Sequence, residues 1–210
     1  MNVILINGSP RKNGNTSLAL EWMADELHQE GILTETIQIG DRRVRGCIAC
    51  EHCSTSQDAL CAFNDDGISD LIVKFRQVDG IAIGSPVYFG GMAGTLKSAM
   101  DRVFYAGRRN GGLRNKIGAA VASARRNAAQ DTFNQIVTYY HLAEMVVAPS
   151  HTWVTAYGRA KGEIQHDLEG QQVIRLHANA MAWLLKMRED TKGRVKLPRT
   201  EERTMMNFVR

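Results

Sequence analysis

With 210 residues, 44% of them hydrophobic and 23% charged, the chain has the composition of an ordinary folded domain, which excludes a disordered or fibrous protein. Its formal charge of +4 is mild, and no aromatic-basic interleaving accompanies it, so a nucleic-acid-binding protein is not favoured. No apolar run is long enough to span a membrane and no secretory leader precedes the first strand, so we expect a cytoplasmic protein without membrane contact.

Strand-like and helix-like patterns alternate along residues 1–193, which we expect to form one domain. An apolar run at Val3–Ile6 predicts the first strand, and helical spacing from Thr16 to Glu30 predicts the first helix. Further strands are predicted at 34–39, 80–84, 117–122 and 145–148, each followed by a helix, the last at about 169–188. Parallel strands need crossover helices, so this alternation predicts a doubly wound α/β fold with a five-stranded parallel sheet. Residues 194–210 form a polar and basic tail.

The loop after the first predicted strand, GSPRKNGNTS at residues 8–17, ends where the first helix begins. It carries hydroxyl, amide and cationic side chains to the positive end of a helix, which is what a phosphate group requires. Its spacing matches neither the Walker A loop nor the GxGxxG dinucleotide fingerprint. We therefore expect a site for the single phosphate of FMN, with these donors: Ser9, Arg11, Asn15, Thr16 and Ser17. The alternative is a polar turn in which Thr16 or Ser17 only caps the helix.

The loop after the third predicted strand, SPVYFGGMAG at residues 85–94, puts aromatic side chains at the mouth of the same crevice. Pro86 makes the turn rigid, and the glycines that follow let the backbone approach a flat ring closely. The residues of this turn that we expect at a flavin are Pro86, Val87, Tyr88, Phe89 and Gly90. The alternative is a turn whose aromatic side chains only pack against the core.

All four cysteines lie in the long loop at residues 40–64 that follows the second strand, with the spacing C-x2-C-x2-C-x7-C. In a reducing compartment such clustering favours metal or redox chemistry over disulfides. The first three spacings are those of a bacterial ferredoxin run, so a [4Fe-4S] cluster is favoured, with the ligands Cys47, Cys50, Cys53 and Cys61. A zinc site and free or redox-active cysteines stay open as alternatives.

The motifs GSPRKNGNTS and SPVYFGGMAGTLKSAMDR resemble the NADPH-dependent FMN reductase family, and the cysteine loop resembles its iron-sulfur flavoprotein branch. The likeness is close over residues 1–102. It implies a flavodoxin-like sheet of order 2-1-3-4-5, in which the first loop holds the FMN phosphate and the second lines the ribityl chain and isoalloxazine ring. Many relatives are glycine-rich after the fourth strand, whereas SARRNAAQ at 123–130 has no glycine, so Ser123 and Arg125 become candidates for contact with the flavin or NADPH phosphate. A solvated charged loop is equally consistent with this stretch.

We therefore expect an oxidoreductase in which FMN takes electrons from NAD(P)H at its N5 position and the protein supplies no catalytic acid or base. Electrons would leave singly through a [4Fe-4S] cluster beside the flavin, or as a pair to a quinone, a nitro compound or a free flavin. A ferredoxin-like protein is a further acceptor class. One alternative is an electron carrier reduced by a ferredoxin-like partner, and another is a non-redox binding protein stabilised by zinc. The resemblance also implies a homodimer or homotetramer, with the tail at 194–210 packing on a neighbouring subunit.

Overall fold

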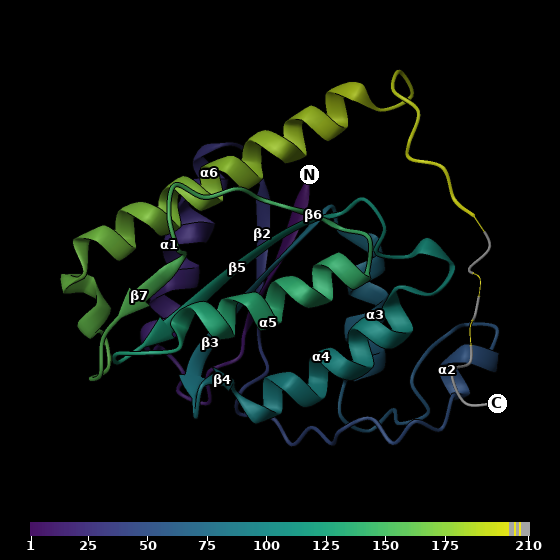
Figure 1. Ribbon diagram of the computed structural model, residues 1–210, viewed down its shortest axis with the longest axis horizontal. Helices are drawn as coiled ribbons and strands as arrows, with labels where there is room; N and C mark the ends of the chain where they lie inside the picture. The colour runs from purple at the N-terminus through teal and green to yellow at the C-terminus, as the bar shows by residue number, and fades with distance from the viewer. Residues whose placement is uncertain (202–203, 205, 207–210) are drawn as a thin grey trace.

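A parallel sheet runs through the middle of the molecule, and helices cover both of its faces (Figure 1). The computed structural model describes residues 1–201, 204 and 206. The main path of the sheet has the order β2-β1-β3-β5-β6, and every pair along it is parallel. The strands of this path are β1 (Asn2–Asn7), β2 (Leu33–Gln38), β3 (Gly80–Tyr88), β5 (Ile117–Ala124) and β6 (Val146–Val147). They are the five predicted strands in the predicted spatial order.

The sheet has seven strands, so the predicted number of five is wrong. The two additional strands are β4 (Gly91–Met92), which pairs antiparallel with β3, and β7 (Thr155–Tyr157), which pairs parallel with β5. Strands of two and three residues are too short to give an alternation of apolar and polar residues, so no sequence pattern predicts β4 or β7.

The edge position beside β5 is divided between β6 and β7. The first pairs with Ile117 and Gly118 at the start of β5, and the second pairs with its last three residues. Between them, Nε2 of the buried His177 accepts a hydrogen bond from the backbone N–H of Ala120 at 3.2 Å. The other ring nitrogen, Nδ1, donates to the carbonyl oxygen of Pro149 at 3.0 Å, and burial lowers the pKa of this imidazole. A neutral histidine thus satisfies a backbone donor where the edge strand is interrupted.

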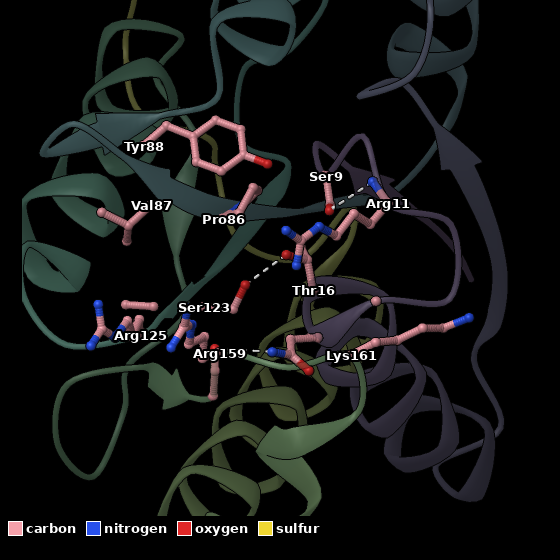
Figure 2. A pocket seen from close by; sticks show the side chains of 14 residues that line it. Ser9, Arg11, Thr16, Pro86, Val87, Tyr88, Ser123, Arg125, Arg159 and Lys161 are labelled. Carbon is pink, nitrogen blue, oxygen red and sulfur yellow. Dashed lines mark hydrogen bonds between the residues drawn. The ribbon is translucent and has the colours of Figure 1, made fainter.

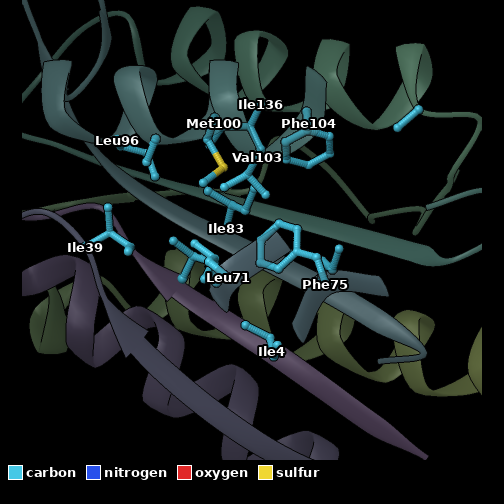
Figure 3. Close-up of a cluster of buried hydrophobic side chains, with 14 of the residues drawn as sticks. Ile4, Ile39, Leu71, Phe75, Ile83, Leu96, Met100, Val103, Phe104 and Ile136 are labelled. Carbon is cyan, nitrogen blue, oxygen red and sulfur yellow. The ribbon is translucent and has the colours of Figure 1, made fainter. Parts of the chain in front are cut away.

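Helices α1 (Asn15–Gln29) and α6 (Leu168–Thr191) pack on one face of the sheet. The opposite face is covered by α3 (Ile68–Gln77), α4 (Gly94–Gly107) and α5 (Ala129–Leu142), and Figure 3 shows the apolar core that they bury. Because successive strand residues point to opposite faces, Ile4 and Ile6 of β1 join this core while Val3 and Leu5 join the other one.

Three short helical turns complete the fold of the described residues. They are α2 (His52–Thr55) in the cysteine loop, η1 (Arg109–Gly111) after α4, and η2 (Glu163–His166) before α6. Helix α3 begins after Gly67, and the Asp66 carboxylate accepts a hydrogen bond from the Ile68 N–H at 3.3 Å. In the part of the chain that the structure describes, no helix combines the length and the apolar character needed to cross a membrane.

The tail that begins at residue 194 is held at one point by Arg114, whose Nη2 donates to the carbonyl oxygens of Pro198 and Arg199 at 2.9 and 2.8 Å. Val195 and Leu197 are exposed. The end of the predicted tail, at 202–203, 205 and 207–210, lies outside the described residues. Its packing on a neighbouring subunit stays a prediction.

Candidate functional site

A cleft opens at the carboxyl ends of β1, β3 and β5 (Figure 2), and we call it the strand-end cleft. Loops far apart in the sequence converge on it because the three strands are parallel neighbours in the sheet. The cleft is lined by Ser9, Arg11, Gly14, Asn15, Thr16, Pro86, Val87, Tyr88, Ser123, Ala124, Arg125, Gly158, Arg159 and Lys161. Nine of the twelve residues predicted for the flavin site are among them.

The first loop is shaped by short-range hydrogen bonds. The Asn7 carboxamide oxygen accepts from the Ser9 N–H at 3.0 Å, and the Ser9 hydroxyl oxygen accepts from the Arg11 N–H at 3.1 Å. The loop continues into α1, whose N-cap is Gly14 and makes no side-chain capping bond. The alternative of a helix capped by Thr16 or Ser17 is therefore wrong, and the first turn of α1 presents its N–H groups to the cleft.

The backbone that follows β2 packs closely against this loop. A Cβ atom at Gly40 would lie 2.2 Å from the Ser9 carbonyl carbon. Gln38 Nε2 also donates to the Ser9 carbonyl oxygen at 2.5 Å. Only glycine fits at residue 40, so the start of the cysteine loop and the base of the strand-end cleft are built together.

Thr16 and Ser123 join the two sides of the cleft. Both side chains are buried, and their hydroxyl oxygens lie 2.6 Å apart in a hydrogen bond between the start of α1 and the end of β5. Each hydroxyl carries one hydrogen, and only one of the two is used in this contact. The other can be donated to a ligand.

Asn15 contributes a buried acceptor. Its Nδ2 donates to the Gly158 carbonyl oxygen at 3.0 Å, whereas its Oδ1 has no hydrogen-bond partner among the described residues. A buried polar atom without a partner is costly, so this oxygen fits a ligand that brings a hydroxyl group into the cleft.

Four cationic residues surround the cleft: Arg11, Arg125, Arg159 and Lys161. Within the described residues none of the four pairs with a carboxylate. In Figure 2 the Arg11 side chain points into the cleft, whereas the Lys161 side chain points outward. Sequence reasoning missed Arg159 and Lys161 because they follow β7, the short strand that it did not predict. Their one signal is the GRAK run at 158–161.

Three predicted residues do not line the cleft. The Ser17 hydroxyl is directed along α1 and donates to Glu21 Oε1 at 3.1 Å. Phe89 and Gly90 form the tip of the β3–β4 hairpin, with φ angles of 47° and 84°, and the Phe89 side chain is fully exposed. The left-handed backbone there is easy for glycine and unusual for phenylalanine.

A second pocket, which we call the cysteine pocket, gathers all four cysteines as free thiols. Its other walls come from the loop itself and from the last turns of α4, with Phe63, Arg102 and Tyr105. Burial raises the pKa of the Cys53 thiol, and the negative charges of the other three sulfurs raise it further. The set of donors, four thiols around one pocket, fits an iron-sulfur cluster. No group of three or more His, Cys, Asp or Glu side chains in the described residues converges on a single metal ion.

The two sites are separate within one chain. They share no lining residue, and they lie toward opposite ends of α4. This helix begins just after the β3–β4 hairpin and reaches the cysteine pocket at Arg102, a rise of roughly 12 Å at 1.5 Å per residue. The predicted position of a cluster beside the flavin stays a prediction.

Residues 1–160 match the model of the family described as NADPH-dependent FMN reductase. The chain belongs to this family. It is 37% identical over 194 residues to an iron-sulfur flavoprotein of Methanocaldococcus jannaschii, a match that covers 89% of this chain and 98% of that protein. The predicted place in the iron-sulfur flavoprotein branch of the FMN reductase family is confirmed.

Solved structures agree on the fold of this family member. A structure of RosB with bound 8-demethyl-8-formylriboflavin-5'-phosphate superposes with a TM-score of 0.72 at 16% identity, covering 97% of this chain and 92% of RosB. A flavodoxin from the domain Archaea gives a TM-score of 0.60 at 16% identity, with 89% and 99% of the two chains covered. The fold is flavodoxin-like. By its family the protein is a flavin oxidoreductase, and FMN is the cofactor that the family supports.

Proposed function

We propose that the protein takes electrons from NAD(P)H through bound FMN and passes them to a small-molecule or protein acceptor. The acceptor classes are quinones, nitro compounds, flavins and ferredoxin-like proteins. The observation that carries the proposal is the convergence of four segments, at the ends of β1, β3, β5 and β7, on one cleft whose lining has four cations and no carboxylate. Such a cleft suits an anionic, phosphorylated ligand.

The phosphate of FMN would lie at the start of α1. There the guanidinium of Arg11 can form two parallel hydrogen bonds with a phosphate dianion. The N–H groups of the first turn of α1 can also donate to it, because the positive end of the helix dipole lies there. The free hydrogen of the Thr16–Ser123 pair can be donated to the ligand, and Asn15 Oδ1 can accept from a ribityl hydroxyl.

The flat ring would lie against the second loop. Pro86, Val87 and Tyr88 form the wall of the cleft opposite α1, and Ala124 and Arg125 form its edge at the end of β5. FMN supplies the hydride and electron chemistry when it is bound. The described lining residues include no histidine, cysteine or carboxylate, so the chain's part is to bind and orient the ring and to set its electrostatic environment.

The reductant would approach over the exposed cations of the cleft. One phosphate dianion does not balance four cationic side chains, so Arg125 and Arg159 leave positive charge for the phosphates of NAD(P)H. This favours NAD(P)H over an uncharged reductant.

The four cysteines would hold a [4Fe-4S] cluster, which supplies one-electron transfer when it is bound. The thiols line one pocket, and Cys47 and Cys50 are exposed at its mouth. The M. jannaschii relative carries the iron-sulfur flavoprotein name. The exposed thiols also favour the alternative of an electron carrier, because a protein partner could exchange electrons there directly.

In one chain the two pockets are separated by most of α4, so an assembly of subunits would help to connect them. We therefore propose a homodimer or homotetramer in a reducing cytoplasm. Sedimentation as a monomer at micromolar concentration would count against this part of the proposal.

The experiment is steady-state oxidation of NADPH and NADH by anaerobically prepared protein of known FMN, iron, zinc and sulfide content. We expect oxidation with quinone or nitro acceptors, and four iron atoms and four sulfides per chain. The Cys53→Ser variant should lose iron and transfer to one-electron protein acceptors, while it keeps FMN. Zinc without iron would overturn the cluster, and a protein that never oxidises either nucleotide would be an electron carrier instead.

A further inference from the structure

Arg102, on α4, is an arginine with only 2% of its surface exposed, and its guanidinium is surrounded by the cysteine loop. Its Nε donates to the sulfur of Cys61 at 3.2 Å. Its Nη1 donates to the Arg45 carbonyl oxygen at 3.2 Å and to the Asp66 carboxylate. Its Nη2 donates to the Phe63 carbonyl oxygen at 3.2 Å and to Asp66 Oδ1 at 3.0 Å. All five N–H donors of the guanidinium are therefore used.

These contacts fix the loop at three places. They hold its beginning at Arg45, its fourth cysteine, and its end at Phe63 and Asp66, although the only regular element within 45–66 is the four-residue α2. The Phe63 ring also lies close to two cations, with the guanidinium carbon of Arg45 at 4.1 Å from its centroid and that of Arg102 at 5.4 Å. A planar fork with five fixed donors can make this set of bonds, and a lysine ammonium cannot.

The charge of Arg102 is balanced by a buried carboxylate. The Arg102 and Asp66 side chains are 1% and 7% exposed, so the pair is shielded from water. The Nε–H that faces Cys61 is nevertheless aimed at a sulfur and not at the carboxylate. Hydrogen bonds and positive charge near a cluster sulfur favour the more negative, reduced state of an iron-sulfur cluster.

We propose that Arg102 is the positioning residue of the cysteine pocket: it orders residues 45–66 for cluster binding, and its Nε–H···Sγ bond to Cys61 raises the reduction potential of the cluster. The second half of this statement rests on the proposed [4Fe-4S] cluster. The first half concerns the protein alone and can be tested without a cluster.

Arg76 gives a matched control. It also ties the cysteine loop to α4, because its guanidinium donates to the carbonyl oxygens of Asp58 and Ala59 at 2.9 Å and to that of Ala106 at 3.0 Å. It contacts no cysteine sulfur in the described structure. The Arg76→Lys variant therefore reports what loss of a loop brace does without loss of the bond to sulfur.

The experiment compares wild type with Arg102→Lys, Arg102→Gln and Arg76→Lys. In cluster-free protein, hydrogen exchange of the amides at 45–66 should become faster in both Arg102 variants. In reconstituted protein, the midpoint potential from an EPR-monitored redox titration should become more negative in Arg102→Lys and more negative again in Arg102→Gln, which also removes the charge. Both Arg102 variants should lose iron to a chelator about 10-fold faster than wild type, or more, which is the size of effect expected when a group that supports metal ligands is removed. The Arg76→Lys variant should keep the wild-type potential.

Asp66→Asn is a second test should Arg102→Gln not fold. It leaves the Nε donor in place and removes the balancing charge, so the potential should become more positive than in wild type. The proposal would be overturned if Arg102→Lys kept both the wild-type rate of amide hydrogen exchange at 45–66 and the wild-type midpoint potential. Equal potential shifts in Arg102→Lys and Arg76→Lys would overturn the bond to Cys61 as the cause. A wild-type protein that takes up no iron would instead overturn the cluster, while the exchange data would still decide the ordering role.

Discussion

The strand-end cleft is held by the sheet, whereas the cysteine pocket is held by side chains that reach it from neighbouring helices. Every loop of the cleft leaves a parallel strand, and the contacts across it, such as Thr16 with Ser123, join the ends of regular elements. The cysteine loop has only α2 as regular structure, and Arg76 and Arg102 fix it to α3 and α4. The same chain thus uses backbone topology to place one site and a few buried cations to place the other.

This difference predicts which property a substitution at each site lowers most. A site built by the sheet keeps its shape when one side chain is removed, so the loss appears in ligand affinity. A site built by buried cations loses its shape, so the loss appears in stability and metal retention.

The largest effect is expected for Asp66→Ala, which leaves the buried Arg102 guanidinium without its carboxylate. Breaking a buried ion pair by removing one partner costs about 3–5 kcal/mol, and the free energy of unfolding should fall by this amount in urea titrations. Asp65→Ala is the control, because Asp65 is exposed, and it should change the free energy of unfolding by less than about 0.5 kcal/mol. Equal effects of the two substitutions would contradict the role given to the buried pair.

Arg11→Ala should instead act on affinity. Hydrogen bonds to charged groups contribute about 1.5–3 kcal/mol, so FMN should bind about 10- to 150-fold more weakly while the free energy of unfolding of the ligand-free protein changes little. The dissociation constant can be measured by quenching of flavin fluorescence. Lys12→Ala is the matched control, because Lys12 pairs with Asp41 at 3.1 Å outside the cleft lining.

Riboflavin, which has no phosphate, sharpens this prediction. Its affinity should be the same for wild type and Arg11→Ala. If Arg11→Ala lost as much affinity for riboflavin as for FMN, Arg11 would contact the flavin ring and not the phosphate.

Ser123→Ala should lower the free energy of unfolding by less than Asp66→Ala does. It leaves the buried Thr16 hydroxyl without its partner, which costs about 1–3 kcal/mol of stability. The double variant with Thr16→Val removes both polar groups and should recover part of this loss in a double-mutant cycle. Strictly additive losses would show that the two hydroxyls do not act together.

The smallest effect is expected for the pH dependence of stability that comes from His177, which packs against the sheet. His177 is buried and neutral, and burial lowers its pKa, so the unfolded chain binds a proton at a higher pH than the folded protein does. Stability from this group is complete above the unfolded pKa of about 6.5 and falls as pH decreases below it, by up to about 1.4 kcal/mol per pH unit. Urea midpoints between pH 8 and pH 5 check this. The His177→Gln variant should show a flatter profile, and a profile identical to wild type would contradict this assignment.

Much of the fold could be predicted because long apolar runs mark buried parallel strands. The predicted strand path and the five main helices agree with the structure within a few residues at each end. The divided edge beside β5 could not be predicted, because it depends on β7, a strand of three residues that shares the edge with the predicted β6. It depends as well on His177, more than fifty residues away from Ala120 in the chain and paired with it only after folding.

The candidate sites divide in the same way. Ser9, Arg11 and Thr16 line the strand-end cleft because a loop between strand and helix limits where its side chains can point. Ser17 lies outside this lining, and its hydroxyl donates to Glu21, one helical turn on. Arg102 gave no signal, since in sequence it is one more cation in a helix and arginine is usually exposed.

Anaerobic single-turnover mixing of the FMN-loaded protein with NADPH or NADH tests whether the bound flavin accepts electrons from a nicotinamide nucleotide. With either nucleotide, we expect the flavin absorbance to be lost within the turnover time of the enzyme. A flavin that stays yellow with both nucleotides, and is bleached only by a reduced ferredoxin-like protein, would exclude the NAD(P)H-dependent oxidoreductase and leave an electron carrier in its place.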